Sequence, residues 1–252
     1  MFTMMNNARL NVGLQGVEIG ERATQTAITY ATQRIQSARA GAETATPVAI
    51  IEHPDVRRTL MRMKALTQAA RALLYYAAGQ VDRAHLGIEG AKVRLDILTP
   101  LAKSYGSDAG CEIASLGVQV HGGMGFVEET GAAQHYRDIR IAPIYEGTNG
   151  IQAADLVGRK LTGDGGAGLA ALIADMKAEA RDDGLITLIT AVERTGAHMI
   201  TANIDDRLAG STPFLTMVSV AVCGWLLERQ MRIAAAHDTA FYKAKVAVAG
   251  YY

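Results

Sequence analysis

The stretch EHPDVRRTLMRMKAL, residues 52–66, decides the fold class. Pro54 has the backbone angle that suits the first turn of an α-helix, where its missing N–H is not needed. The apolar residues that follow recur at intervals of three and four and therefore lie on one helical face: Val56, Leu60, Met63 and Leu66. The stretch predicts a helix, which we expect to end near Gly87.

The same helical periodicity continues on both sides of this stretch, and β-branched residues seldom alternate with polar ones. Thr99 and Pro100 repeat the start signal, with a hydroxyl as N-cap before a proline at the first helical position. Nearer the C-terminus, a stripe at the same spacing predicts a buried helix face: Leu215, Val218, Val222 and Trp225. The pattern predicts an all-α protein with helices over these ranges: 3–39, 54–87, 100–121, part of 131–139, 147–161, 167–182, 185–208, 213–236 and a last one toward residue 252.

The composition excludes several classes of protein. The chain has 252 residues, of which 49% are hydrophobic, enough for a substantial core. Its 25 basic residues balance 25 acidic ones, so no net field favours nucleic acid or an anionic membrane. The 2 isolated cysteines and 6 unpatterned histidines predict neither a disulfide framework nor a metal site. With no apparent membrane span or signal peptide, we expect a protein of a reducing compartment, the cytoplasm or an organelle matrix.

Two glycine-rich segments have different interpretations. GDGGAG at 163–168 formally matches the dinucleotide-binding pattern GxGxxG, but that pattern requires a preceding strand and this segment follows a helical one. We interpret it as a linker. QVHGGMGF at 119–126 also follows a helix, so one glycine serves as its C-cap. The additional glycines favour a close approach of backbone N–H groups to a phosphate, and both interpretations stay open.

The stretch RDIRIAPIYEGT at 137–148 places an acid in an unusual setting. Glu146 follows an apolar run and precedes Gly147, after which a new helix begins. The helix dipole favours an acid near a helix N-terminus, but this explains neither the apolar run nor the glycine. A carboxylate that faces an apolar cavity has a raised pKa, which suits a general base near neutral pH. Gly147 would leave room for a substrate, and Tyr145 would supply a wall.

Taken in order, several segments resemble the C-terminal helical domain of the acyl-CoA dehydrogenase family. The distances between them fit as well, including Arg9 to Arg34 and Gln119 to Glu146. The similarity covers residues 1 to about 161 and rests on these segments: NNARL at 6–10, YATQRIQ at 30–36, EHP at 52–54, QVHGGMGF at 119–126 and RDIRIAPIYEGT at 137–148. Residues 164–252 resemble, more loosely, the extra helical domain of a larger-chain subgroup.

The resemblance implies an up-and-down four-helix bundle over residues 1–162, followed by a second, smaller helical bundle over residues 163–252. Members of the family carry an N-terminal helical domain and a middle β-domain before this region. We therefore expect the chain to be a C-terminal fragment that folds but catalyses little or nothing by itself.

By the same resemblance, the protein is an FAD-dependent acyl-CoA dehydrogenase. Glu146 matches the base that removes the α proton of the thioester, while a hydride leaves the β carbon for FAD to give the trans-2-enoyl-CoA. Arg9 and Gly147 match positions that bind the substrate, beside the predicted wall at Tyr145. The residues that match FAD-binding positions, some of them across a subunit interface, are Arg34, Gln119, Gly122, Gly123 and Thr148.

The resemblance also implies partners. They are an acyl-CoA substrate, an electron-transfer flavoprotein or similar acceptor, and further copies of the chain in a homodimer or homotetramer. Two other functions stay open. An acyl-CoA oxidase would use the same base but pass its electrons to oxygen. A non-catalytic helical assembly module would use the bundle alone, but it gives no reason for the Tyr-Glu-Gly-Thr turn.

Overall fold

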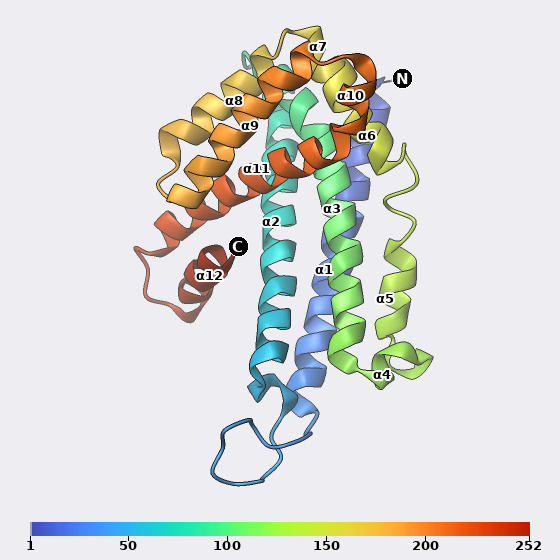
Figure 1. Ribbon diagram of the computed structural model, residues 1–252, viewed down its shortest axis with the longest axis vertical. Coiled ribbons are helices and arrows are strands. Elements are labelled where there is room, and N and C mark those ends of the chain that lie inside the picture. Colours follow the sequence, from blue (N-terminus) through green and yellow to red (C-terminus); the bar gives the residue numbers. More distant parts are fainter. Residues whose placement is uncertain (1) are drawn as a thin grey trace.

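The computed structural model describes residues 2–252, and these residues form an all-α protein, as predicted (Figure 1). Within them there is no β-strand, only an isolated antiparallel bridge between Ile35 and Ala49. Short 3₁₀ turns occur at Ile50–Glu52 and Glu128–Thr130, and a π-helical turn at Leu156–Lys160. The α-helices are α1 (Phe2–Gln33), α2 (Pro54–His85), α3 (Ala91–His121), α4 (Gly123–Phe126), α5 (Ala132–Ile139), α6 (Asn149–Asp155), α7 (Leu161–Gly163), α8 (Ala167–Glu179), α9 (Asp183–Thr201), α10 (Ile204–Ala209), α11 (Ser211–Ala234) and α12 (Ala240–Tyr251).

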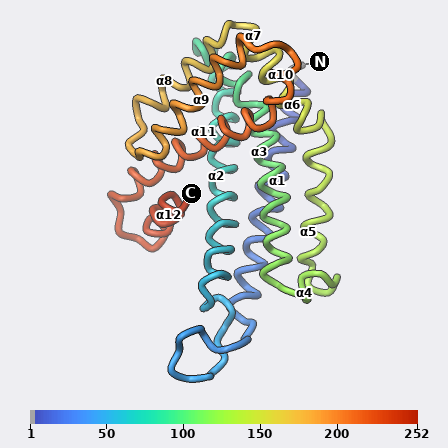
Figure 2. Tube along the Cα trace, viewed as in Figure 1, coloured from blue at the N-terminus to red at the C-terminus, as the bar shows by residue number. Residues whose placement is uncertain are grey.

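Three long helices and a shorter one form the predicted up-and-down bundle. α1 and α2 have 32 residues each, and α3 has 31. The chain reverses direction between successive helices, so α1 and α3 run parallel while α2 runs antiparallel beside them (Figures 1 and 2). The shorter α5 packs against α3 and α1 as the fourth member. The helices from α8 onward gather at one end of this bundle and along α2.

Glycines allow the backbones of α1 and α3 to touch. A Cβ atom on Gly16 would lie 2.1 Å from the carbonyl oxygen of Gly106. A Cβ atom on Gly106 would in turn lie 2.9 Å from the carbonyl oxygen of Gly13. Protein interiors are close-packed, so larger residues here would force the two helices apart. The glycines therefore set the spacing between the helices at the centre of the bundle.

α1 ends earlier than the sequence predicted. The predicted helix ran to residue 39, but α1 stops at Gln33. The following residues pair across a loop instead, because the N–H of Gln36 donates to the carbonyl of Val48 at 3.0 Å. Ser37 has a φ of +60°, which no residue within a right-handed helix adopts. Residues 34–49 thus form the loop at the end of the bundle where α1 passes to α2 (Figure 1).

The predicted helix start at Thr99 and Pro100 is wrong. α3 already begins at Ala91, after Gly90 in a left-handed conformation, and Pro100 lies inside the helix. The hydroxyl of Thr99 donates back to the carbonyl of Leu95 at 2.8 Å, whereas an N-cap hydroxyl would accept from a later N–H. Proline inside a helix costs roughly 3 kcal/mol. Both residues are buried, so packing around them offsets this cost and overrides the local signal.

α11 is the central helix of the second half of the chain, in contact with α2, α9 and α12. The predicted apolar stripe on it is confirmed, since Leu215, Val218, Val222 and Trp225 are each at most 3% exposed. One continuous cluster of buried apolar residues runs from α1 to α11. The division of the chain into 1–162 and 163–252 stays a prediction.

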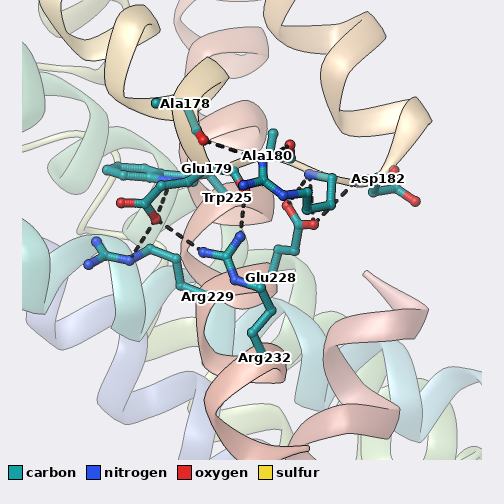
Figure 3. Close-up of polar contacts among 9 residues, drawn as sticks. Ala178, Glu179, Ala180, Asp182, Trp225, Glu228, Arg229 and Arg232 are labelled. Carbon is teal, nitrogen blue, oxygen red and sulfur yellow. Dashed lines mark hydrogen bonds and ion pairs between the residues drawn. The ribbon is translucent and has the colours of Figure 1, made fainter.

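Two carboxylates fix the corner between α8 and α9 to α11 (Figure 3). The side chain of Glu228 accepts the backbone N–H groups of Arg181 at 2.9 Å and Asp182 at 3.2 Å. Glu179 accepts from the indole Nε1 of Trp225 at 3.1 Å. Without Glu228, the backbone N–H groups of Arg181 and Asp182 would lose these acceptors. The layer formed by α8, α9 and α11 is therefore held by polar contacts as well as by its core.

By length and composition, α11 is the one helix in residues 2–252 that is apolar enough to cross a membrane. In its most apolar window, 67% of the residues are buried against the rest of the protein. Such burial is typical of the core helix of a folded domain.

Replacing Gly16 by alanine tests the contact between α1 and α3. We expect Gly16→Ala to lower the free energy of unfolding by about 1–3 kcal/mol, because its Cβ atom would collide with the backbone of Gly106. Gly79→Ala on α2 is the matched control, with nothing within 4 Å of its Cβ position. This control should gain about 0.5–1 kcal/mol of stability from helix propensity. Urea unfolding of the 252-residue chain measures the free energy of unfolding of both variants. Similar changes in this free energy for the two variants would contradict the close contact between α1 and α3.

Candidate active site

The chain bends sharply between α5 and α6, at the acid that the sequence singled out. Glu146 has a φ of +56° and Gly147 a φ of +81°, so two successive residues are left-handed. For a residue other than glycine, this conformation costs about 1–3 kcal/mol and is found where the surroundings enforce it. The turn closes through the N–H of Asn149, which donates to the carbonyl of Pro143 at 3.0 Å. From the interior, Nε2 of Gln152 donates to the carbonyl of Glu146 at 3.3 Å.

Gly147 is also needed for space. A Cβ atom at this position would lie 2.9 Å from Nε2 of Gln152, which itself is fully buried. The glycine therefore serves both the positive φ and the close contact with α6. Its predicted role in lining a thioester site stays a prediction.

Thr148 ends the turn and begins α6. Its Oγ1 accepts the N–H of Ile151 at 3.3 Å, which makes it the N-cap of the helix. The side chain is exposed, and a hydroxyl that accepts one bond can still donate its own proton. The cap is thus compatible with the predicted contact to FAD.

A polar cluster on α3 holds the first residue of α6, with Lys103 and Ser107 buried and Asp108 exposed. Nζ of Lys103 donates to Oδ1 of Asn149 at 2.8 Å. Nδ2 of Asn149 donates to Oδ1 of Asp108 at 2.7 Å and to Oγ of Ser107 at 3.0 Å. Three side chains of α3 therefore grip one side chain at the end of the turn.

The sequence carries a signal for this cluster that our predictions did not include. Lys103, Ser107 and Gly110 recur at intervals of four and three, which places the lysine on the same helical face as small residues. Small residues at that spacing mark a close contact with another helix. A lysine at such a contact becomes buried only if the partner helix covers it, and a buried lysine needs a specific partner.

Burial governs the ionisation of this cluster. It lowers the pKa of Lys103 to about 8, while the negative charges of Asp108 and Glu146 partly oppose the shift. The positive charge of Arg9 lowers the same pKa further. Burial also raises the pKa of the Asp108 carboxyl, against the hydrogen bond from Asn149. Lys103 is therefore mostly protonated at neutral pH and close enough to Glu146 for their charges to interact.

Arg9 of α1 is a second, nearly buried cation near this cluster. Its side chain is 11% exposed, and NH1 lies 3.8 Å from Oδ2 of Asp155 on α6. Nε of Arg9, Oγ of Ser104 and Oε1 of Gln152 are buried without a protein partner. Buried polar atoms usually have a partner, so these atoms can take bonds from ordered water or from a polar ligand.

The side chain of Glu146 is exposed. Ile141 and Ile144 beside it are 51% and 48% exposed. Tyr145 is half-buried, and its hydroxyl donates to Oε1 of Gln15 on α1. Within residues 2–252 the apolar run beside Glu146 thus lies open and does not enclose the acid, and the substrate pocket with Tyr145 as its wall stays a prediction.

The residues predicted to bind FAD separate into two groups. Thr148 lies at the turn, whereas the other four lie where α1 and α3 end, at the far end of the bundle (Figure 1). At about 1.5 Å per residue, roughly 18 Å of helix axis separates Ser107, beside the turn, from Gln119. One chain therefore does not bring the two groups together. The distant group consists of Arg34, Gln119, Gly122 and Gly123.

The distant group has the chemistry that a phosphate requires. Arg34 and Gln119 are exposed, and NH2 of Arg34 donates a long hydrogen bond to Oε1 of Gln36 at 3.4 Å. Gly122 follows α3 with a φ of +59°, as a C-cap does. Nothing lies within 4 Å of the Cβ positions of Gly122 and Gly123, so their backbone is open to a ligand. A guanidinium beside an exposed glycine backbone suits the phosphates of FAD.

Comparisons with known proteins agree along the whole chain. Residues 1–161 match the family described as "Acyl-CoA dehydrogenase, C-terminal domain", and residues 164–252 match "Acetyl-CoA dehydrogenase C-terminal like". The 3-methylmercaptopropionyl-CoA dehydrogenase of Ruegeria pomeroyi is 43% identical over 99% of this chain and 46% of its own length. The broad-specificity linear acyl-CoA dehydrogenase FadE5 of Mycobacterium tuberculosis is 32% identical over 100% of this chain and 47% of its own. The chain thus spans about half the length of these curated relatives.

Solved structures share the fold. Caenorhabditis elegans ACDH-11 in complex with C11-CoA is 20% identical, with a TM-score of 0.80 over 98% of this chain and 42% of that one. An acyl-CoA dehydrogenase from Bacillus anthracis complexed with FAD is 23% identical, with a TM-score of 0.75 over 98% of this chain and 46% of that one. At these identities, the likeness supports the arrangement of helices.

Removing the cap of α6 tests how firmly the turn is held. We expect Thr148→Val to lower the free energy of unfolding by about 1 kcal/mol, because the N–H of Ile151 loses its acceptor. Thr148→Ser keeps the oxygen and should leave stability within a few tenths of a kcal/mol. Urea unfolding of the chain separates the two variants. If valine were as well tolerated as serine, the cap would contribute nothing.

Proposed function

The chain belongs to the acyl-CoA dehydrogenase family, and we propose that it supplies the catalytic base of the reaction, Glu146, together with part of the FAD site. The observation that carries the proposal is the turn itself. A glutamate is held at a positive φ, with its carboxylate exposed, by contacts from both neighbouring helices. Strained backbone of this kind is typical of functional sites.

In the proposed reaction, the carboxylate of Glu146 takes the proton α to the thioester carbonyl and becomes a neutral acid. Bound FAD would supply the acceptor for the hydride that leaves the β carbon, so the acyl-CoA becomes the trans-2,3-enoyl thioester. Gly147, next to the acid, would line the thioester site. Arg9 supplies a cation behind the turn and helps to position the substrate. Closure over the exposed Glu146 then comes from the substrate and from protein outside the described residues.

The proposed FAD contacts come from two ends of the bundle. Thr148 would donate its hydroxyl near the base. Arg34, with the backbone of Gly122 and Gly123 and the side chain of Gln119, would hold the phosphates of an FAD that another copy of the chain contacts at its own turn. This division follows from the separation of the two groups along α3, and it makes a homodimer or homotetramer part of the proposal.

The names of relatives support the partners that we propose. The Ruegeria pomeroyi and Mycobacterium tuberculosis proteins are named for acyl-CoA thioesters, and the Acetobacterium woodii relative is a subunit of a caffeyl-CoA reductase-Etf complex. We infer an acyl-CoA substrate and an electron-transfer flavoprotein as acceptor. The proposed location is the cytoplasm, which suits the two free cysteines, Cys111 and Cys223.

A chimaera tests the base. We would join this chain to the preceding part of the Ruegeria pomeroyi relative and follow oxidation of 3-methylmercaptopropionyl-CoA with an artificial electron acceptor. Glu146→Gln should lower kcat by about 10²–10⁴-fold, because an amide cannot accept the α proton. FAD content, measured by absorbance, should stay unchanged.

Glu129→Gln is the matched control, since Glu129 is an exposed glutamate outside the turn. It should retain the activity of the unsubstituted chimaera. Full turnover by the Glu146→Gln chimaera would disprove the assignment of the base. Hydrogen peroxide formed in step with substrate would favour the oxidase alternative. The 252-residue chain alone, with added FAD, should show no turnover.

A further inference from the structure

Lys103 is a buried cation that neither the bundle nor the proposed proton transfer explains. Its side chain is 0% exposed, and lysine is almost never fully buried unless it is paired. The contact it makes is a hydrogen bond from Nζ to Oδ1 of Asn149, at 2.8 Å, with no ion pair to a carboxylate in residues 2–252. The charged ammonium group of the lysine thus hydrogen-bonds to the neutral side-chain amide of Asn149, at the end of the turn.

Asn149 connects Lys103 to the turn that carries Glu146. Its side chain is held by Lys103, Ser107 and Asp108, while its own N–H closes the turn by donating to the carbonyl of Pro143 at 3.0 Å. The same residue therefore links the interior of α3 to the backbone that carries Glu146. No other residue of the turn has a side chain bonded to α3 among the described residues.

The left-handed backbone at Glu146 needs such a support. A non-glycine residue leaves this conformation when its surroundings do not enforce it. Gln152 supports the turn from α6 through its bonds to the carbonyls of Glu146 and Gly147. Asn149 supports it as well, because its side chain is bonded to α3. Only this second support includes a charged group, the ammonium group of Lys103.

We propose that Lys103 is a positioning residue for Glu146: through Asn149, its buried ammonium group holds the 146–148 turn in its strained conformation. The inference rests on the proposed function, since it assigns Lys103 a task only if Glu146 is the reacting group. Lys103 itself does not touch the substrate in this scheme.

A purely structural role for Lys103 makes a different prediction. If the lysine only filled space between α1 and α3, an apolar side chain of similar length would replace it well, because a buried charge contributes little net stability. Protection of the whole core would then stay uniform. A positioning role predicts instead a local change, confined to the turn.

Charges on every neighbouring element bear on Lys103. Asp108 lies on the same helix, Arg9 on α1 and Glu146 on the turn, and each interacts with the ammonium group. Asp155 on α6 lies beside Arg9 and moderates its charge. The negative charge of Glu146 stabilises the protonated lysine, so its removal lowers the pKa of Lys103 from about 8.

Hydrogen exchange of the full chain, followed residue by residue by NMR, tests the proposal. In Lys103→Met, the amide of Asn149, which closes the turn, should exchange at least tenfold faster than in the unsubstituted protein. The Glu146 Cα and Cβ chemical shifts should move away from left-handed values. Buried α3 amides such as that of Leu101 should keep their protection, which separates release of the turn from loss of the fold.

Lys160→Met is the matched control, because Lys160 is also nearly buried but pairs with Asp96, away from the turn. It should leave the exchange of Asn149 unchanged. The proposal is overturned if Lys103→Met leaves the Asn149 amide as protected as before, if Lys160→Met exposes it equally, or if all core amides lose protection together. These readouts need no activity, so they stand even if Glu146→Gln shows that the base lies elsewhere.

A second measurement tests the interaction of the two charges. Titration of the Lys103 Cε resonance should give a midpoint near pH 8. In Glu146→Gln, the midpoint should fall by a few tenths of a unit, because the lysine loses a nearby negative charge. An unchanged midpoint would overturn the claim that the charges of Lys103 and Glu146 interact.

Discussion

The backbone contact between α1 and α3 is the constraint on which the rest of the structure depends. Gly16 and Gly106 bring the two helices to a distance that no side chain would permit. At this distance, polar residues on the adjoining surface of α3 are cut off from solvent, so Lys103 and Ser107 must find partners inside. Both side chains bond to the side chain of Asn149, and these hydrogen bonds position the turn before α6.

The turn and the bundle have different mechanical roles. The long helices are continuous and closely packed, so they form a frame that does not adjust easily to local strain. The strain is concentrated instead at Glu146, where a few hydrogen bonds from Gln152 and Asn149 maintain it. The proposed site therefore combines an exposed carboxylate with a rigid backbone support, as accurate placement of a reacting group requires.

Local patterns in the sequence were sufficient for the fold class and for the buried stripe on α11, because apolar spacing depends on neighbouring residues. The same reasoning failed at Pro100, where packing outweighs a local start signal. The solvent exposure of Glu146 could not be predicted by this reasoning either, since it depends on segments far apart in sequence. Lys103 was missed for a similar reason, because its burial follows from a glycine contact between two helices that are not consecutive. The motif around Glu146 identified the candidate acid but not the residues that hold it.

The parallel arrangement of α1 and α3 has a consequence for folding. Parallel neighbours cannot be joined by a short connection, so the contact between them must wait for the whole of α2 and both flanking loops. A chain that emerges from the ribosome can pair α1 with α2 early, but the glycine face of α1 then stays uncovered until α3 has been made. This delay leaves the glycine face of α1 without its partner during synthesis, when a nascent helix is most exposed to wrong partners.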